Sequence, residues 1–119
     1  CCARRTRYDR SDIYTYANAM LIAVNPYKEL GLYAPAIRRQ YRAIGSDSSL
    51  PPPHIFAISE RCFRGMLSSR SQCICVTGES GAGRTETCRH ILHFLAHALT
   101  AYSLAPVEVL ITAGHRLYM

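Results

Sequence analysis

The chain has 119 residues and a mass of 13.3 kDa, which is the size of one small domain. Hydrophobic residues make up 49% of it, which excludes a chain too polar to collapse, and no apolar run approaches the roughly 18–20 residues that cross a bilayer. Fourteen basic residues against eight acidic ones give a formal charge of +6, which favours anionic partners, above all phosphate. Aromatic residues are not interleaved with the arginines as in a groove for single-stranded nucleic acid, so we expect no nucleic acid partner.

The N-terminal residues 1–12 are polar and rich in arginine, which predicts a loosely held basic arm. No apolar core follows the first charges, so we expect no secretory signal. The first residue is Cys1 rather than methionine, which fits a processed product and a fragment of a longer chain equally well.

The six cysteines form no CxxC pair, which removes the main sequence support for a zinc ribbon or a thioredoxin-like redox site. Cys73 and Cys75 alternate along an expected strand, so both side chains should lie on the same side of it. We expect the thiols to be buried and reduced, as is usual in a cytosolic protein.

The first regular element is expected in the apolar stretch 13–24, whose β-branched and aromatic residues favour a strand. Residues 17–20 interrupt this stretch and leave room for a helical turn. Pro26 ends it, because the residue before a proline is held in an extended conformation. Pro35 suits the first turn of a helix, and apolar residues recur at helical spacing from there until Gly45.

Two further helices and one strand are predicted after the loop 46–53. The first of these helices begins near His54 and has an apolar stripe that Phe63 and Leu67 widen. This stripe contains Ile55, Ile58, Cys62 and Met66. The mostly apolar run 72–77 then predicts a short buried strand. A long helix is expected after it, and this helix should end before Pro106. The stripe of the long helix contains Cys88, Ile91, Leu92, Leu95, Leu99 and Tyr102.

Residues 78–85, Gly-Glu-Ser-Gly-Ala-Gly-Arg-Thr, match the phosphate-binding pattern G-x-x-x-x-G-K-[ST] except at Arg84, where lysine is expected. We call this segment the phosphate loop. Its glycines let backbone N–H groups turn inward, and with the N-terminus of the following helix they form a cradle for the α- and β-phosphates of a nucleotide. Thr85 would hold Mg²⁺, Arg84 would face the β/γ region and Ser80 would reach the γ-phosphate. The alternative is a glycine-rich turn that binds nothing.

Two features of the sequence bear on catalysis. Arginine is planar and bulkier than lysine, so Arg84 should impair turnover more than binding. Hydrolysis also needs an acidic group from a later strand, yet Glu86 and Glu108 are the only acids after Thr85. We therefore expect the hydrolytic site to be incomplete in this chain.

Three histidines, His90, His93 and His97, recur at helical spacing in the last predicted helix. No carboxylate or cysteine completes a metal-binding set nearby, so we interpret them as partly exposed helix residues rather than metal ligands.

Four ordered segments resemble the motor domain of myosin. Residues 78–86 differ at one position from the phosphate loop of that family, GESGAGKTE. Residues 7–16 resemble its RY…D-x-IYTY stretch, residues 24–33 its purine-binding segment VNPYK…Y, and residues 52–58 its PPHIFAI block. The resemblance covers about residues 7–101, and it is specific because a chance match to four blocks in order has a very low probability.

The resemblance implies an α/β fold, namely a P-loop NTPase fragment with a strand–loop–helix unit and an incomplete central sheet. It implies ATP and Mg²⁺ as cofactors, with Thr85 on the metal ion and with Asn25, Pro26 and Tyr33 on the adenine side. No catalytic residue is assigned. The residues that would bind the nucleotide are Asn25, Pro26, Tyr33, Gly78, Glu79, Ser80, Gly81, Ala82, Gly83, Arg84, Thr85 and Glu86.

We divide the chain into the basic arm at 1–12, a partial motor domain at 13–104 and a divergent tail at 105–119. The resemblance implies the ATP-binding part of a cytoplasmic, actin-based cytoskeletal motor, whose actin-binding surface lies outside this chain. Alone, the chain should neither hydrolyse ATP nor move. Two alternatives stay open: a non-catalytic nucleotide- or anion-binding module, and a small P-loop kinase.

Overall fold

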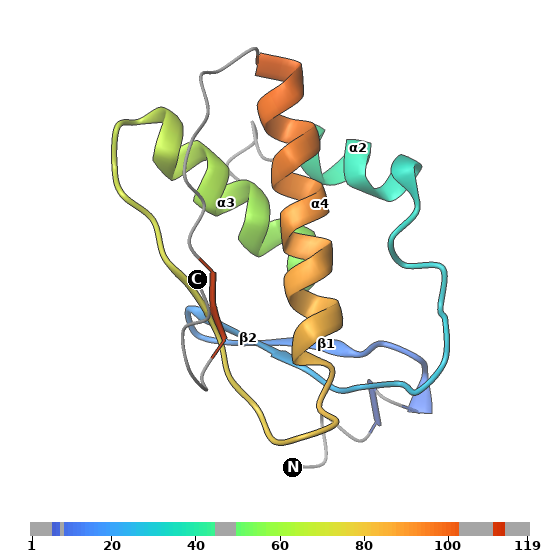
Figure 1. Cartoon of the computed structure of the whole chain (residues 1–119). Coiled ribbons are helices and arrows are strands. Elements are labelled where there is room, and N and C mark those ends of the chain that lie inside the picture. Colours follow the sequence, from blue (N-terminus) through green and yellow to red (C-terminus); the bar gives the residue numbers. More distant parts are fainter. Residues whose placement is uncertain (1–5, 8, 45–49, 103–110, 114–119) are drawn as a thin grey trace.

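A computed structural model of the chain describes residues 6–7, 9–44, 50–102 and 111–113. Its elements are β1 (Tyr14–Ala17), β2 (Met20–Ala23), α2 (Pro35–Ile44), α3 (Ile55–Leu67), β3 (Ile74–Val76), α4 (Arg84–Tyr102) and β4 (Ile111–Ala113). Figure 1 shows the three helices grouped together, with the β1–β2 hairpin running across one end of the group. The expected α/β class is confirmed, and so is an open sheet, because β1–β2 and β3–β4 form two separate pairs.

The apolar stretch 13–24 folds as a hairpin rather than as one strand with a helical turn. β1 and β2 are antiparallel, with Tyr14 opposite Ala23 and Ala17 opposite Met20. Asn18 in the connecting turn has a φ of +54°, a left-handed conformation that asparagine tolerates better than most residues. Residues 17–20, which left room for a helical turn, instead form a tight turn across which Ala17 and Met20 pair with each other.

Helices α3 and α4 build the core by packing against each other. The largest fully buried apolar side chains belong to these two helices: Phe63, Phe94, Ile91 and Leu95. The predicted helices are confirmed, and so is a part of each predicted stripe, because Ile55, Phe63, Ile91 and Leu95 are buried. Phe56 and Phe94 are also buried, although they lie outside the predicted stripes. Cys62 and Met66 are only half-buried, and Leu92 is 46% exposed.

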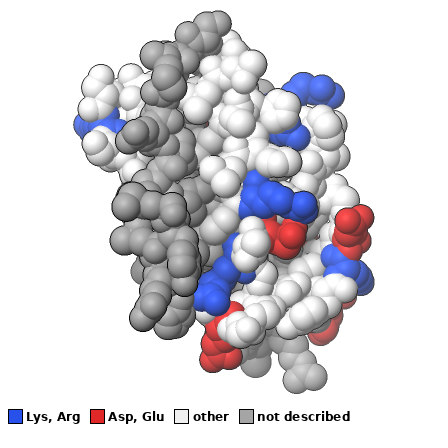
Figure 2. Space-filling model, viewed as in Figure 1, with Lys and Arg blue, Asp and Glu red and all other residues white. Residues whose placement is uncertain are grey.

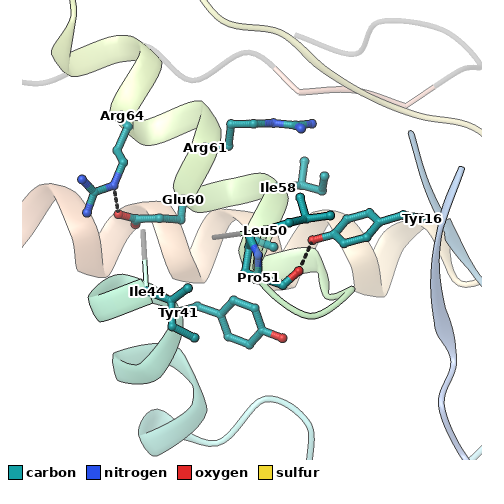
Figure 3. A pocket seen from close by; sticks show the side chains of 10 residues that line it. Tyr16, Tyr41, Ile44, Leu50, Pro51, Ile58, Glu60, Arg61 and Arg64 are labelled. Atoms are coloured by element: carbon teal, nitrogen blue, oxygen red, sulfur yellow. Dashed lines mark hydrogen bonds and ion pairs between the residues drawn. The ribbon is translucent and has the colours of Figure 1, made fainter. Parts of the chain in front are cut away.

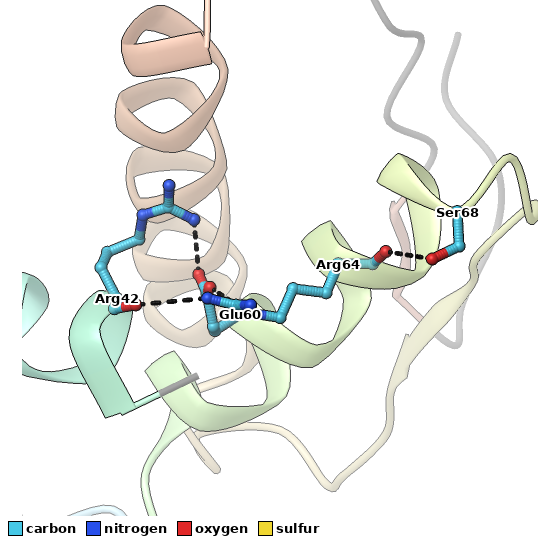
Figure 4. A network of polar contacts seen from close by, with 4 residues as sticks. All are labelled: Arg42, Glu60, Arg64 and Ser68. Atoms are coloured by element: carbon cyan, nitrogen blue, oxygen red, sulfur yellow. Dashed lines mark hydrogen bonds and ion pairs between the residues drawn. The ribbon is translucent and has the colours of Figure 1, made fainter. Parts of the chain in front are cut away.

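One buried carboxylate fastens α2 to α3. Glu60 is 3% exposed, and its two oxygens accept bonds of 2.7 Å from Arg42 Nη1 and Arg64 Nε (Figure 4). The Arg42 guanidinium also lies 4.7 Å from the centre of the Phe63 ring, so this cation covers the edge of the core. A buried carboxylate without partners would be costly, and here each oxygen has a cation of its own.

The segment before α3 is held in place by two tyrosine hydroxyls. Tyr16 donates to the carbonyl of Pro51 at 3.0 Å, and Tyr41 donates to that of Pro52 at 3.1 Å. Together with side chains of α3, these groups enclose a pocket of about 200 Å³ (Figure 3). The prolines thus join the hairpin to both helices.

His54 is the N-cap of α3 and a junction between several elements. Its Nδ1 accepts from the Phe56 amide at 2.9 Å, and its Nε2 donates to the Leu32 carbonyl at 2.9 Å. Its ring also lies 5.0 Å from that of Tyr14 and 4.9 Å from that of Tyr41. Burial lowers the pKa of His54 to about 4, although the Leu32 carbonyl acts in the opposite direction.

The strand before the phosphate loop is present but is not buried as predicted. β3 pairs in parallel with β4, and Cys73 and Cys75 are exposed, with their Sγ atoms 3.7 Å apart. The expectation that these two thiols share one side is confirmed, whereas the expectation of burial is wrong for both. Both cysteines line an open pocket together with side chains of β2.

We predict that the chain loses stability in mild acid because of His54. In the folded chain the ring stays neutral down to about pH 4, while in the unfolded chain it gains a proton below about pH 6.5. The free energy of unfolding should therefore fall by about 2–3 kcal/mol between pH 6.5 and 4. Urea unfolding at a series of pH values measures this, and His54→Gln should flatten the dependence. The exposed His93→Gln is the matched control, and an equal flattening there would refute the assignment.

Candidate functional site

The phosphate loop connects the end of β3 at Val76 to the start of α4 at Arg84. Gly81 and Gly83 have φ values of +79° and +89°, which side-chain-bearing residues rarely adopt. The Ala82 amide donates to the Glu79 carbonyl at 3.2 Å, and the Thr87 amide donates to the Gly83 carbonyl at 3.0 Å. The predicted strand–loop–helix unit is therefore present, and the loop curls back on itself before the helix begins.

Most backbone amides of this loop are available to a ligand. Among the backbone bonds that the described residues make outside helices and strands, Ala82 is the one donor between residues 78 and 84. The first amides of α4 have no acceptor within the helix either, and they carry its positive dipole end. Residues 78–82 are exposed. This arrangement can bind an oxyanion such as a phosphate group.

The purine segment meets the phosphate loop through two side chains. Asn25 Nδ2 donates to the Gly81 carbonyl at 2.9 Å, and the Tyr27 hydroxyl donates to the same oxygen at 3.2 Å. Asn25 also accepts from the Tyr27 amide at 2.9 Å, and it lies beside Gly83, where an added Cβ would be 3.7 Å from its amide group. Sequence reasoning missed Tyr27 as a site residue, although it belongs to the same VNPYK block as Asn25.

Pro26 and Tyr33 have different surroundings from Asn25. Pro26 lines a separate pocket of about 190 Å³ that it shares with Lys28. The Tyr33 ring stacks on His90 of α4, with the ring centres 3.5 Å apart and 9° between the planes. Its hydroxyl bonds that of Tyr14 at 2.6 Å, and burial is the main cause that raises its pKa. Of the three residues predicted on the adenine side, Asn25 is thus the one that contacts the loop.

Three predicted site residues form the first turn of α4. The Arg84 side chain runs beside Gly78, since a Cβ added there would lie 3.6 Å from its Cγ. Arg84 also lines a pocket of about 410 Å³ between β2 and β3. Thr85 is exposed, and Glu86 accepts from Arg89 at 2.6 Å, with both side chains about 60% exposed. The Thr85 hydroxyl, the Arg84 guanidinium and the open amides of the loop together suit a phosphate group with its Mg²⁺.

On the side of the molecule shown in Figure 2, the Lys and Arg side chains do not form one continuous basic patch. They lie in several separate groups, some of them beside Asp or Glu side chains. In the part of the chain that the structure describes, no three His, Cys, Asp or Glu residues are grouped to hold a metal ion. None of the described helices combines the length and apolar composition that crossing a membrane requires.

We predict that Asn25→Ala loosens the phosphate loop without unfolding the chain. The variant loses both the bond to Gly81 and the bond from the Tyr27 amide, so stability should fall by about 1 kcal/mol. Hydrogen exchange of the amides at 79–83 should become faster, as mass spectrometry can measure. Tyr27→Phe removes one bond and should have a smaller effect in the same direction. Unchanged hydrogen exchange in Asn25→Ala would show that the Asn25 side chain does not order the phosphate loop.

Comparison with known proteins places this site in a family. Residues 2–111 match the model described as myosin head (motor domain). The chain is similar to myosin-1 of Malassezia globosa, with 42% identity over 91 residues that cover 76% of this chain and 7% of the relative. It is also similar to unconventional myosin-XV and to myosin-14 of Homo sapiens, at 43% and 42% identity, covering 77% and 82% of this chain but 3% and 5% of the relatives. The chain thus spans less than a tenth of the length of these three relatives. It belongs to the myosin head family and carries a part of the motor domain.

Proposed function

We propose that the chain is the ATP-binding part of a myosin-like, actin-based motor and that it binds Mg-ATP at the phosphate loop. The observation that carries the proposal is the contact between two distant segments, in which Asn25 and Tyr27 donate to Gly81 beside a row of open amides. The relatives are named as myosins, and their family fold is that of P-loop NTPases.

Each group of the proposed site has a distinct task. The open amides of the phosphate loop and of the N-terminus of α4 would donate hydrogen bonds to the α- and β-phosphates, with the Ser80 hydroxyl near the γ-phosphate. Thr85 would bind Mg²⁺, which when bound neutralises charge between the β- and γ-phosphates. Asn25 would fix the loop beneath the purine, and Tyr33 would border that side from its stack on His90. Glu79 and Glu86 would flank the site without a role in proton transfer.

Binding and hydrolysis are separate questions for this chain. Hydrolysis needs acidic and water-positioning groups, and we propose that these belong to other parts of a full motor. Actin binding and movement would likewise depend on those other parts, in the cytoplasm and on the cytoskeleton. By itself the chain would hold nucleotide without turnover.

A second candidate is a non-catalytic nucleotide- or anion-binding module, and the position of Arg84 favours it. The aliphatic part of this side chain lies against Gly78 and faces the pocket between β2 and β3. A guanidinium anchored in this way supports binding through charge but does not follow the transferred phosphoryl group as a flexible lysine can.

We predict that the chain binds a fluorescent ATP analogue in the presence of Mg²⁺ and that Gly83→Ala weakens this binding about tenfold or more. The φ of +89° strains any residue with a Cβ, so the loop amides would leave their positions. Equilibrium fluorescence titration gives both affinities. Gly31→Ala is the matched control, because Gly31 also has a positive φ, +65°, but open space around it. Equal affinities for all three proteins would refute the proposed site.

We further predict that Arg84→Lys raises turnover more than it changes affinity. Lysine restores a compact, mobile charge at the β/γ region, while the backbone amides that dominate binding stay the same. In a longer gene product that includes the rest of the motor, ATPase turnover should rise on the order of tenfold, with a change in nucleotide affinity of roughly threefold at most. Equal turnover for the two proteins would contradict this role of position 84.

A further inference from the structure

A pocket lined by basic side chains lies between α2 and the C-terminal half of α4. Its volume is about 360 Å³. Four of its lining residues are basic and none is acidic: Arg38, Arg39, Arg42 and His97, beside Pro35, Ala98 and Ala101. In the view of Figure 1, α2 passes behind the upper part of α4, and the lining residues come from these two helices. We call this the α2–α4 groove.

Arg38, one of the residues that line the α2–α4 groove, has a buried donor that is unused. The Nε of Arg38 is shielded from solvent and has no hydrogen-bond partner among the described residues. A buried N–H without an acceptor is unfavourable, and such atoms in folded proteins usually mark a missing partner. Because this Nε is out of reach of water, the Arg38 side chain must turn toward the groove before an anion bound there supplies that acceptor.

Two of the positive charges in the groove are also uncompensated. Arg42 shares its guanidinium with Glu60, but within the described part of the chain no carboxylate pairs with Arg38 or Arg39. These two arginines are consecutive on α2, and His97 faces them from α4. Like charges brought this close repel each other, and an anion between them would remove the repulsion.

We propose that the α2–α4 groove binds a phosphate monoester. A guanidinium presents parallel N–H donors that match two phosphate oxygens, and the second guanidinium balances the second negative charge. The alanines of α4 form a small, apolar wall that leaves room for the organic group of the ester. The groove is independent of the phosphate loop, because His97 lies roughly 20 Å along α4 from Arg84.

Inorganic phosphate is the first probe, and the Arg38 Nε–H resonance in a nitrogen–proton correlation spectrum is the local readout. Phosphate should shift this resonance in a saturable way as the Nε–H gains an acceptor. The amides at 79–83 report the phosphate loop in the same spectrum, so binding at one site is read separately from binding at the other. An Arg38 resonance that does not move while phosphate saturates the loop would overturn the proposal.

Variants test whether the groove, rather than the overall charge, attracts the ligand. Arg38→Ala and Arg39→Ala should each weaken phosphate binding in the groove about tenfold, because each removes a charge-assisted hydrogen bond. Arg70→Ala is the control, since it removes the same charge from an exposed position after α3. Arg38→Lys keeps the charge but loses the paired N–H donors of the guanidinium. Its phosphate affinity should lie between that of the parent and that of Arg38→Ala. Equal affinities for Arg38→Ala and Arg70→Ala would overturn the proposal.

Two probes then separate the sources of the phosphate group. One is phosphatidylcholine vesicles that contain phosphatidylinositol 4,5-bisphosphate, with plain phosphatidylcholine vesicles as the reference, and the other is soluble glucose 6-phosphate. If the chain co-sediments with the phosphoinositide vesicles, and if Arg38→Ala abolishes this binding while Arg70→Ala retains it, the ligand is a lipid headgroup. An Arg38-dependent response to glucose 6-phosphate without vesicle binding assigns a soluble ester. A response to neither probe would refute a phosphate monoester as the ligand.

Discussion

The arrangement of the described elements depends on the neutral ring of His54. This one side chain caps α3, bonds the Leu32 carbonyl and packs against tyrosines from β1 and α2. Each ring nitrogen has a specific task, one as acceptor and one as donor, so only one neutral tautomer satisfies both. Protonation would place a hydrogen on Nδ1 against the Phe56 amide and a charge inside an apolar cluster. The junction thus couples the start of the core helix to the hairpin and to the segment that precedes α2.

That junction also sets the geometry of the site. The hairpin and the segment after it carry Asn25 and Tyr27, while β3 and α4 carry the phosphate loop. Both parts meet the same core, since α3 packs on α4 and His54 joins α3 to β1. Asn25 can therefore reach Gly81 although the two are 56 positions apart in the chain. Tyr33, which precedes α2, stacks on His90 of α4 and adds a second contact between these two parts.

The sequence predicted the local features well because their causes are local. The pattern at 78–85 requires glycine at positions of positive φ, and Gly81 and Gly83 have that conformation. The proline at the start of α2 and the start of α3 near His54 were also predicted from neighbouring residues. The core stripes were predicted in part: Phe63, Ile91 and Leu95 are buried as expected. Phe56 and Phe94 are buried outside the predicted stripes, and Leu92 is exposed. Periodicity finds a helix, but which face is buried depends on the partner helix.

By itself, then, the sequence determined the family, the strand–loop–helix unit and the glycines of the phosphate loop, because motif identity and backbone preference are properties of adjacent residues. Only the tertiary structure decided that residues 13–24 form a hairpin, that Tyr27 joins Asn25 at Gly81, and that Tyr33 stacks on a helix instead of contacting the loop. It also decided that Arg38, Arg39 and His97 share one groove. These outcomes depend on contacts between segments far apart in the chain, and their free energy comes from packing that no local pattern records.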